Sequence, residues 1–594
     1  MTVKPSFSER FSDFYVRHEY AVFFLFVLVW QAVLLSAGHR RMIETDNFTH
    51  ALRLLDFIQS GSWKETLYMH DNCPYGQMLH FTRITDMFMY VMTLPFLPFM
   101  DVKDAVLYGC FLYNPVLACL SAAALVWAGK AFFSPLARAF SVVLYFGAST
   151  TVNMFIAGRP DHHVLLNLLV FLLAGNLLHG IKTQKTAYFK AAGLFAGLSA
   201  WATPEGFLVG MLFLGSMVAA WLTRYQNVRQ IRLFCQFFFI SATACLIANP
   251  PMQGLFYPDN GRLSFLMAVV LGLASLSFYA EEVLERKKYI RSFVKRFLSL
   301  LLLTSVSLGI AVLMFGTKAL FSSPIPEELI DIWASKISEL QPGYRGYLSD
   351  AFVSIPLDSC CIGVIAFFLA SNRIRKILMI FCLPLIVTTA LTMMINRFAR
   401  IENPFAVLVL PFSLQIFLGS FSFSRQTISV FKFSGAIVLL YFFVVQVVRY
   451  SYYIQETWPR KVDLTALLPH LSQKEGCFLA DNDRGPELAW LTGKAVIGSP
   501  YHSNAQGILD NHYLLNSRKK AELASLLKKR GIGTIILDMA FHGDAKSDRE
   551  LLKRIYFKKE DICFIRPVFD LPPEVKGKVM LFDVDFTACD QPGK

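Results

Sequence analysis

Three short acidic motifs, two at the ends of apolar segments and one in a loop, are the first candidates for chemistry in this 594-residue chain. The first is Glu44-Thr45-Asp46-Asn47, which follows the first apolar segment, and the second is Arg159-Pro160-Asp161-His162-His163, which precedes the fourth. The third is Ile337-Ser338-Glu339-Leu340-Gln341-Pro342, in the largest internal loop. Carboxylates and histidines at a membrane boundary are energetically costly unless they bind something. The motifs therefore predict a divalent-metal site.

The second motif is the stronger metal candidate. An Asp followed two residues later by a His directs both side chains toward one ion where the backbone is extended. Carboxylate oxygens suit Mg²⁺ or Mn²⁺, and an imidazole nitrogen favours Mn²⁺. We therefore expect Asp46, Asp161 and His163 to bind Mg²⁺ or Mn²⁺. His162 is expected to point away from the ion and to support the site from outside the ligand set.

The composition places these motifs in a membrane protein. Hydrophobic residues make up 55% of the chain, and its mean hydropathy is +0.46, which exceeds what a soluble core buries. About thirteen apolar stretches are long enough to cross about 30 Å of hydrocarbon, and they lie near 20–37, 105–128, 139–156, 164–180, 190–204, 206–223, 233–249, 263–280, 297–316, 353–371, 377–395, 404–422 and 433–449. The predicted fold class is a polytopic α-helical membrane protein.

Lysine and arginine collect in every second loop, which marks the cytoplasmic side. These basic clusters lie within 182–190, 224–232, 286–291, 373–376 and 425–432. Arg40 and Arg41 depart from the rule locally. The net charge of +14 is therefore largely explained by membrane topology, and no nucleic-acid partner is expected.

Residues 87–100 decide the topology of everything downstream. This stretch is apolar but contains Pro95 and Pro98. If it crossed the membrane, Asp161 would lie opposite Asp46 and the basic clusters would lie outside. We therefore expect an interfacial or re-entrant segment, which leaves one outer compartment for Asp46, Asp161, Glu205, Glu339, Arg397 and the C-terminal region.

The chain divides into two predicted domains. Residues 1–449 form a transmembrane domain with external loops at 38–104 and 317–352. Residues 450–594 are more charged and are expected to form an extracytoplasmic α/β domain, with strands at 477–480, 495–498 and 534–537 and helices at 486–492 and 517–530. Four cysteines would face the outer compartment, and a disulfide among them is allowed without an assigned pairing: Cys73, Cys477, Cys563 and Cys589.

The order of these motifs resembles the catalytic subunit of oligosaccharyltransferases, which are membrane glycosyltransferases of GT-C architecture. The matching residues are Asp46 after the first span, Asp161 and His163 after the third, Ser338-Glu339-Leu340-Gln341-Pro342 in the late loop, and Arg397-Phe398 before a following span. The resemblance covers the membrane region in order and includes an external C-terminal domain. Its most specific single feature is the Ser-Glu-x-Gln-Pro segment.

The resemblance implies a role for each matching residue. Asp46, Asp161 and His163 would hold the cation near the phosphate of a lipid-linked donor, and Arg397 would bind that phosphate. Glu339 would reach the same site or the acceptor. Breaking a glycosyl-phosphate bond places negative charge on the leaving oxygens, which a metal and an arginine stabilise. Inversion at the anomeric carbon then needs a positioned acceptor and a carboxylate base, so Asp46, Asp161 and Glu339 are the catalytic candidates.

One family motif is missing from this chain. Oligosaccharyltransferases that modify Asn-x-Ser/Thr carry a Trp-Trp-Asp motif that reads the hydroxyl residue. The corresponding segment here is Ala480-Asp481-Asn482-Asp483-Arg484-Gly485-Pro486, which contains no tryptophan. An acceptor other than that sequon is therefore expected. Asp483, Tyr501 and His502 are candidates for acceptor contacts, and loop structure is the alternative for each.

Further polar residues lie beside the motifs. His80 and Arg83 belong to the first external loop and are candidates for the donor phosphate, while local pairing in a solvated loop is the alternative. Glu44 and Glu205 stand at the ends of apolar segments. Both are candidates for contacts with a sugar, the acceptor or, for Glu205, the metal.

The predicted function is metal-assisted transfer of a sugar or oligosaccharide from a polyprenyl-phosphate-linked donor to an extracytoplasmic protein, glycan or lipid, with inversion. The first alternative is a monosaccharide transferase that uses a polyprenyl-monophosphate sugar. A glycolipid transporter or flippase is less favoured, because the acids gather at one face and no internal repeat is evident. Short loops and a compact external domain favour a bacterial inner membrane with the active site on the periplasmic side.

Overall fold

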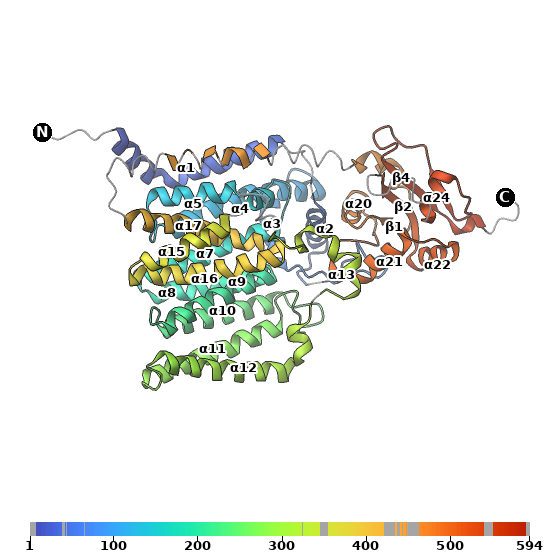
Figure 1. Ribbon diagram of the computed structural model, residues 1–594. Helices are drawn as coiled ribbons and strands as arrows, with labels where there is room; N and C mark the ends of the chain where they lie inside the picture. The colour runs from blue at the N-terminus through green and yellow to red at the C-terminus, as the bar shows by residue number, and fades with distance from the viewer. Residues whose placement is uncertain are drawn as a thin grey trace.

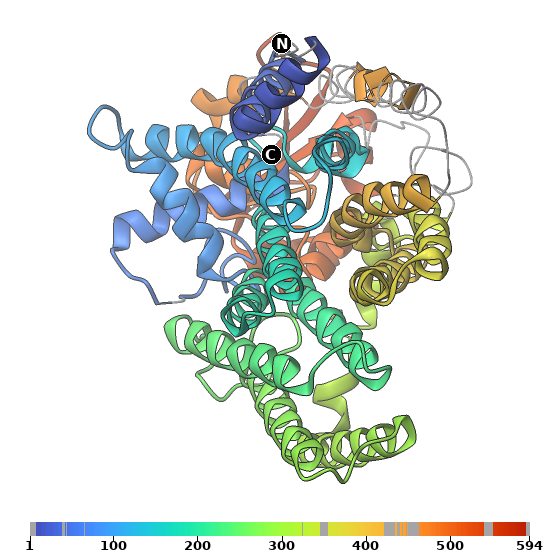
Figure 2. The same cartoon turned by 90° about the vertical axis from the view of Figure 1, so that its left-hand side faces the viewer.

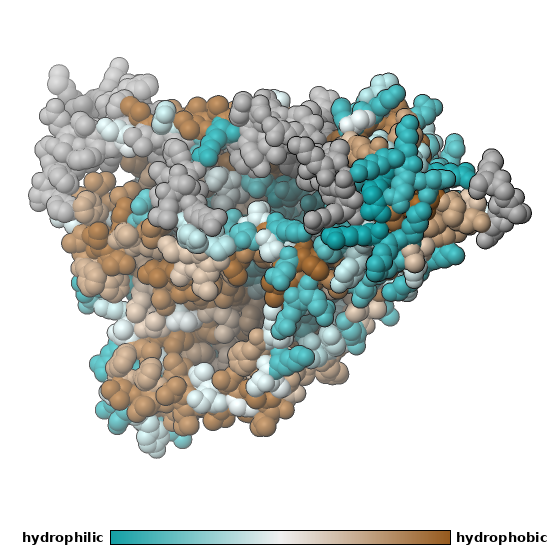
Figure 3. All heavy atoms as spheres, turned by 45° about the vertical axis from the view of Figure 1, so that its right-hand side comes forward, coloured by the Kyte–Doolittle hydropathy of each residue, from teal (hydrophilic) through white to brown (hydrophobic). Residues whose placement is uncertain are grey.

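A bundle of long helices carries a small mixed α/β domain at one end (Figure 1). The computed structural model describes residues 7–37, 42, 44–64, 66–323, 325–344, 355–420, 462–539 and 550–589, with part of 434–449. Hydrophobic side chains cover the visible face of the bundle, and hydrophilic side chains gather over the C-terminal domain (Figure 3). This distribution is the one expected of a bundle that lies in lipid and a domain that lies in water.

Nine helices in the described part of the chain are long and apolar enough to cross a membrane. They are α1 (Phe7–Ala37), α4 (Val102–Gly129), α7 (His162–Thr183), α9 (Pro204–Leu222), α10 (Val228–Ala248), α11 (Phe265–Arg286), α12 (Phe293–Phe321), α16 (Asn372–Met394) and α17 (Ala399–Ser420). Three shorter helices complete the bundle, α5 (Pro135–Gly147), α8 (Thr186–Ala202) and α15 (Ile355–Leu369). The prediction of a polytopic helical membrane protein is confirmed.

Helices occupy twelve of the thirteen stretches that apolar length predicted. The thirteenth, 433–449, is described only in part, and its described residues, 434, 435, 437, 440, 441, 443–446, 448 and 449, are helical. The stretch 139–156 is not one helix, because Ala148 has extended backbone angles between α5 and α6 (Ser149–Met154). This break turns the chain toward the second acidic motif.

Close helix packing depends on small residues. A Cβ atom at Gly193 of α8 would lie 2.3 Å from the carbonyl oxygen of Phe234 in α10, so only glycine permits this approach. Helices α11 and α12 lie at the rim of the bundle in both views (Figures 1 and 2). Only 6% of the most apolar window of α12 is buried, so this helix presents most of its side chains to lipid.

The connection between α1 and α4 contains two helices, α2 (Thr45–Ser60) and α3 (Arg83–Thr93). Helix α3 has 11 residues and rises about 16 Å, which is too short to cross about 30 Å of hydrocarbon. Turns follow it over 94–99. The geometry of 87–100 therefore agrees with a segment that does not cross the membrane.

The second expected loop, 317–352, begins later than predicted because α12 continues to Phe321. It contains α13 (Glu328–Ile332) and two 3₁₀ turns, η1 (Ala334–Lys336) and η2 (Ser338–Leu340). Residues 345–352 lie outside the described part of the chain.

The C-terminal domain is built on a four-stranded mixed sheet of order β1-β2-β4-β3. Strands β1 (Cys477–Ala480) and β2 (Ile532–Asp538) are parallel, and β4 (Val579–Val584) pairs antiparallel with both β2 and β3 (Ile565–Val568). The predicted strands at 477–480 and 534–537 are confirmed, whereas Val496 forms only an isolated bridge with Phe478.

Four helices of the described chain pack against this sheet, and one of them, α24 (Leu551–Lys558), was not predicted. Helices α20 (Gly485–Thr492) and α22 (Lys520–Arg530) coincide with the two helical segments that the sequence predicted, and α21 (Ala505–Leu515) was not predicted.

The C-terminal domain is attached to the connection between α1 and α4. Cys73 and Cys477 form a disulfide, and the backbone amide of Cys73 donates to the carbonyl of Val496 at 3.0 Å. The fully buried Arg530 donates to Asp510 at 2.5 Å and to the Asn72 side-chain oxygen at 2.9 Å. A second disulfide, Cys563–Cys589, lies within the domain. The four cysteines thus form two disulfides, which the sequence left unpaired.

Asp71 lies in the same junction, and its titration is expected to make the stability of the folded protein depend on pH. Gln77 donates to its carboxylate, only 1% of the residue is exposed, and burial raises its pKa to about 7. Since the unfolded value is about 3.9, the ionised group costs stability as pH rises toward 7. Between pH 5 and 8 the free energy of unfolding of the native protein should fall by on the order of 3 kcal/mol. In the Asp71→Asn variant this decrease should be absent.

Thermal unfolding of the purified protein at pH 5 and pH 8 measures this difference. The exposed Asp561 provides the matched control, and Asp561→Asn should follow the native pH dependence. An Asp71→Asn protein that also follows the native curve would show that Asp71 titrates normally.

Candidate functional site

The second acidic motif is held by polar side chains from the membrane helices. In α4, Asn114 donates through Nδ2 to the carbonyls of Ile156 at 2.6 Å and Arg159 at 2.7 Å. From α1, Gln31 donates to the carbonyl of Phe155 at 2.9 Å. These bonds satisfy backbone groups that would otherwise be buried without partners. They fix the path of the chain into α7.

Gly158 completes this turn, because its φ of +80° and the Phe111 ring 2.6 Å from its would-be Cβ exclude other residues. Asp161 then caps α7, and its Oδ1 accepts from the backbone amide of His163 at 2.8 Å. The cap points the Asp161 carboxylate back over the first turn of α7.

Asp161, His162 and His163 form a buried group whose ligand-type atoms all lie within 4.8 Å of one another. Oδ1 of Asp161 lies 2.8 Å from Nδ1 of His163 and 3.5 Å from Nδ1 of His162. Neighbouring ligands around an ion with bonds of about 2.1 Å are about 3.0 Å apart. His162 therefore belongs to the group and does not point away, because the first turn of α7 places the two imidazole rings 4.2 Å apart.

Two ring nitrogens in this group have no hydrogen-bond partner among the described residues, Nδ1 of His162 and Nε2 of His163. Buried polar atoms are rarely left in this state unless an ion or water satisfies them. Although burial alone would raise the pKa of Asp161, His163, His162 and Arg400 outweigh it and hold that pKa well below the usual range. An ionised carboxylate beside two imidazole nitrogens that lack hydrogen-bond partners fits a divalent cation.

Asp46 lies in the first turn of α2 and contacts the C-terminal domain. Its Oδ1 accepts from the Tyr501 hydroxyl at 2.8 Å, and that hydroxyl also lies 2.9 Å from Oγ1 of Thr49. Asp46 stands outside the group that Asp161 forms with the two histidines. Its pKa is raised to about 7, first by burial and then by Glu44, Asp161 and Glu339. Glu44, Asp161 and Glu339 are thus close enough to Asp46 to add to the effect of burial on its pKa, and a cation stabilises such a group of acids.

Glu339 and Arg400 connect the late loop to the same group. Arg400, near the start of α17, pairs with Glu339 in η2, and its Nη1 lies 3.2 Å from Nδ1 of His163. The loop is anchored behind this contact, because the amide of Asn396 donates to the carbonyl of Gln341 at 2.9 Å. The guanidinium of Arg400 thus joins the Ser-Glu-x-Gln-Pro segment to His163.

Arg397 pairs with a different acid. Its Nε lies 2.6 Å from Oε1 of Glu205, at the start of α9. A tight turn between α8 and α9 positions Glu205, because a Cβ atom at Gly206 would lie only 1.8 Å from the Ser199 carbonyl oxygen. The structure therefore joins Glu205 to Arg397, and joins Glu339 to Arg400.

The remaining predicted residues fall into two groups. Glu44 pairs with Arg159 at 2.5 Å, and Arg83 donates to Asp86 at 3.0 Å and to the Lys64 carbonyl at 3.2 Å. The contacts of Glu44 and Arg83 stabilise the fold of the chain around the site. By contrast, His80, Asp483 and His502 lie around Asp46 and Tyr501.

His80 and His502 make ring contacts, and Asp483 makes a backbone hydrogen bond. The His80 ring lies 6.0 Å from the Tyr501 ring and 4.9 Å from the His502 ring. The Asp483 carbonyl accepts from the Thr45 hydroxyl at 3.0 Å. Residues 480–486 therefore lie beside the start of α2.

A cavity of about 390 Å³ opens next to His80 and His502. It is lined by the connection between α1 and α4, by the segment that follows α10, and by the end of α12. The His80 ring packs near the Tyr501 ring, and Tyr501 donates to Asp46. The cavity therefore borders the side of the site where Asp46 lies.

Sequence reasoning missed two residues of this site, Arg400 and His50. Arg400 follows Arg397 by three residues, so it lies one helical turn further on. His50 is fully buried, its ring lies 5.8 Å from that of His162, and neither of its nitrogens has a partner in the described structure. Burial lowers its pKa to about 4, so the ring is neutral at pH 7. Its spacing of four residues from Asp46 on α2 was the available signal.

No family model matches this chain, and no curated protein matches it in sequence. Its structure is similar to three solved structures of an oligosaccharyltransferase from Archaeoglobus fulgidus. The apo form has a TM-score of 0.73 at 11% identity and covers 94% of this chain and 80% of that one. The form with Zn and sulfate has a TM-score of 0.70 at 11% identity, with 92% and 79% covered.

The third structure, named AglB, is a complex with an inhibitory peptide and a dolichol-phosphate. It has a TM-score of 0.69 at 12% identity, and it covers 89% of this chain and 70% of that one. At these identities the likeness establishes the fold. The chain has the GT-C-like fold of this oligosaccharyltransferase, in the membrane bundle and in the C-terminal domain together.

Proposed function

We propose that this protein is a membrane glycosyltransferase that moves a sugar or oligosaccharide from a polyprenyl-phosphate-type donor to an acceptor outside the cytoplasm. The observation that carries the proposal is the buried Asp161, His162 and His163 group, joined through Arg400 to Glu339. The similar archaeal enzyme was solved with a dolichol-phosphate, with a peptide and with Zn, which supports the same three classes of ligand here.

Asp161, His162 and His163 would hold the divalent cation, Mg²⁺ or Mn²⁺, with Asp46 as a further candidate ligand. A bound cation supplies positive charge opposite the phosphate oxygens as the glycosyl bond breaks. Arg400 stands next to that position and would stabilise the same charge. Glu339 would orient or deprotonate the acceptor, since its side chain is 38% exposed on the side of the late loop.

Arg397 would assist from a second position, since its side chain remains 33% exposed while it pairs with Glu205. Tyr501 holds the Asp46 carboxylate in place by its hydrogen bond. Tyr501 therefore makes the C-terminal domain part of the site. The position of this site at the end of the bundle that carries the C-terminal domain fits chemistry at the outer membrane face.

We further infer that the acceptor is not the ordinary Asn-x-Ser/Thr sequon. The place of the Trp-Trp-Asp motif is taken by residues 480–486, whose Asp483 carbonyl is bonded to Thr45. A site that reads a hydroxyl by hydrogen bonds discriminates by about 10⁴-fold or more against a substrate that lacks it. We expect paired Asn-x-Thr and Asn-x-Ala peptides to differ by less than about tenfold here.

The test incubates the purified protein with lipid-linked donors and follows product formation on the peptides and on glycan and lipid acceptors. Donors that carry one sugar on a monophosphate, tested beside oligosaccharide diphosphates, separate the two transferase classes. Transfer to the Thr peptide alone, abolished by Glu339→Gln, would identify an ordinary oligosaccharyltransferase. Absence of transfer from every lipid-linked donor would remove the transferase proposal.

A further inference from the structure

A polar pocket of about 640 Å³ lies at the end of the bundle away from Asp161. Its walls come from the turn after α7, the turn between α9 and α10, the turn between α11 and α12, and the start of α16. Helix α7 has 22 residues and rises about 33 Å between Asp161 and Gln184, which lines the pocket. The pocket is therefore separate from the candidate site.

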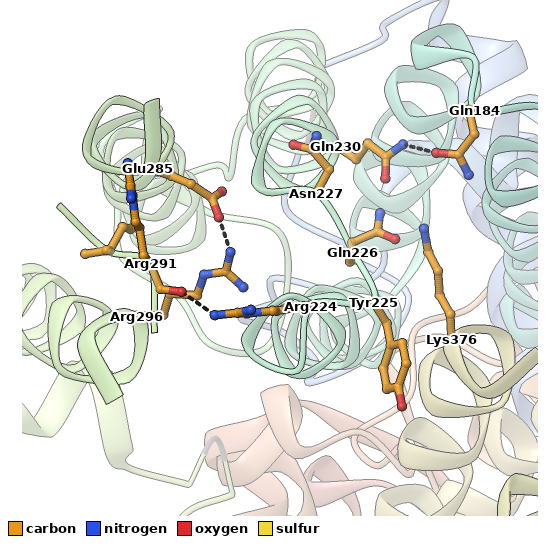
Figure 4. Close-up of a pocket in the computed structure, with 11 residues that line it drawn as sticks. Gln184, Arg224, Tyr225, Gln226, Asn227, Gln230, Glu285, Arg291, Arg296 and Lys376 are labelled. Atoms are coloured by element: carbon orange, nitrogen blue, oxygen red, sulfur yellow. Dashed lines mark hydrogen bonds and ion pairs between the residues drawn. The ribbon is translucent and has the colours of Figure 1, made fainter. Parts of the chain in front are cut away.

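The pocket carries an excess of positive charge. Among its lining residues, Arg224, Arg291, Arg296 and Lys376 are cationic, and Glu285 is the single acid. Four cations against one acid leave an excess of three. Figure 4 shows Arg224 between Gln226 and Lys376 on one side and the residues of the α11–α12 turn on the other.

Part of this charge belongs to the framework of the pocket. Arg296 pairs with Glu285, donates to the Trp221 carbonyl at 2.8 Å and lies over the Trp221 ring. Arg224 and Arg291 are exposed, and Arg224 donates to the Arg291 carbonyl at 2.6 Å. That bond draws the two turns together without neutralising either guanidinium.

Buried polar atoms in the pocket lack partners. Gln226 is 5% exposed, and neither Oε1 nor Nε2 of its side chain has a hydrogen-bond partner in the described part of the chain. Nε of Arg296 is buried in the same state. Buried polar groups are rarely left without partners in folded proteins, so the pocket suits a polar ligand that contacts them.

We propose that this pocket binds the phosphate group of an anionic phospholipid. The exposed guanidiniums of Arg224 and Arg291, together with the unpartnered N–H groups of Gln226 and Arg296, match the oxygens of a phosphodiester. The first turns of α12, beside Arg296, expose apolar side chains on which acyl chains would lie: Phe293, Val294, Phe297 and Leu298. By the distribution of basic loops this end faces the cytoplasmic leaflet, where anionic lipids attract such pockets. The proposal does not depend on the transfer reaction.

The experiment measures binding of phosphatidylglycerol to the purified full-length protein by native mass spectrometry, with phosphatidylcholine as the neutral reference. Each arginine near an anionic surface contributes about a fivefold factor, so Arg224→Gln with Arg291→Gln should weaken phosphatidylglycerol binding on the order of 20-fold. Arg229→Gln, at an exposed residue of α10 outside the pocket lining, should bind as the native protein does.

Gln226→Leu tests the same pocket without a change in charge, and it should weaken binding several-fold. Competition by inorganic phosphate would show that the phosphate group alone is recognised. Failure of phosphate to compete would show that the acyl chains are required, and both results support the site. Equal retention of phosphatidylglycerol by the native protein, the double arginine variant and Gln226→Leu would overturn the proposal.

Discussion

Replacing Asp161 by alanine is expected to lower turnover with a lipid-linked donor by on the order of 10²- to 10³-fold. The carboxylate is the ionised member of the Asp161, His162 and His163 group, and it lies 2.8 Å from Nδ1 of His163. Without it, two imidazoles remain to hold a divalent cation, and the negative charge that favours cation binding is lost. Turnover at saturating donor, with and without added Mn²⁺, measures the effect.

Asp161 also caps α7, so Asp161→Ala removes both the carboxylate proposed to bind the cation and the helix cap. Asparagine is as good a helix cap as aspartate, but it is neutral. Asp161→Asn should therefore keep the thermal stability of the native protein while its turnover and Mn²⁺ affinity fall like those of Asp161→Ala. Asp104→Asn, at an exposed residue in the first turn of α4, is the matched control. Full activity of the native protein in excess chelator would exclude a metal role.

The membrane bundle could be predicted because length and hydropathy decide whether a segment spans a bilayer. The break at Ala148 is the exception. Apolar residues continue through it, but the chain must bend there so that Asn114 can bind the carbonyls of 154–159. A single polar residue in α4 thus controls the path of a distant segment, and hydropathy does not record that contact.

In the C-terminal domain, local pattern predicted the buried strands β1 and β2 but not β3 and β4. Strand β4 pairs with β2, more than forty residues earlier, and its last residues are only half-buried. Its apolar run is short and ends in Asp583 and Val584, so the alternation that marks a strand is weak. Strand β4 is therefore defined by its pairing with β2 and β3, which a local sequence pattern does not show.

The site shows the same division between residue type and tertiary contact. Asp46, Asp161 and His163 were predicted from residue type and position. The structure brings Asp161 and His163 together with His162, whereas Asp46 stands outside that group and accepts from Tyr501. The choice between Arg397 and Arg400 depends on which acid each meets when α17 packs against α9 and the late loop. Sequence spacing does not decide that choice, because Arg397, in the 3₁₀ turn η3 (Asn396–Phe398), and Arg400, in the first turn of α17, are only three residues apart.

Arg400→Ala is expected to lower turnover on the order of 10²-fold or more, because its guanidinium lies beside His163, where the proposed reaction would develop negative charge on the leaving group. Arg400→Lys keeps the charge but loses the planar fork, so it should recover part of the rate. Arg397→Ala removes the partner of Glu205 and should lower turnover less than Arg400→Ala does. Turnover of the three variants on one donor and one acceptor ranks the two arginines.

Coupling with Glu339 shows whether the pair acts as a unit. Glu339→Gln removes the ion pair with Arg400 and should lower turnover on the order of tenfold or more. If the two side chains act together, the double variant should be no slower than Arg400→Ala, because the effects of coupled groups are not additive. Strict multiplication of the two losses would instead mean that Glu339 serves the acceptor independently. A larger loss for Arg397→Ala than for Arg400→Ala would return the phosphate-binding role to Arg397, as the motif order first suggested.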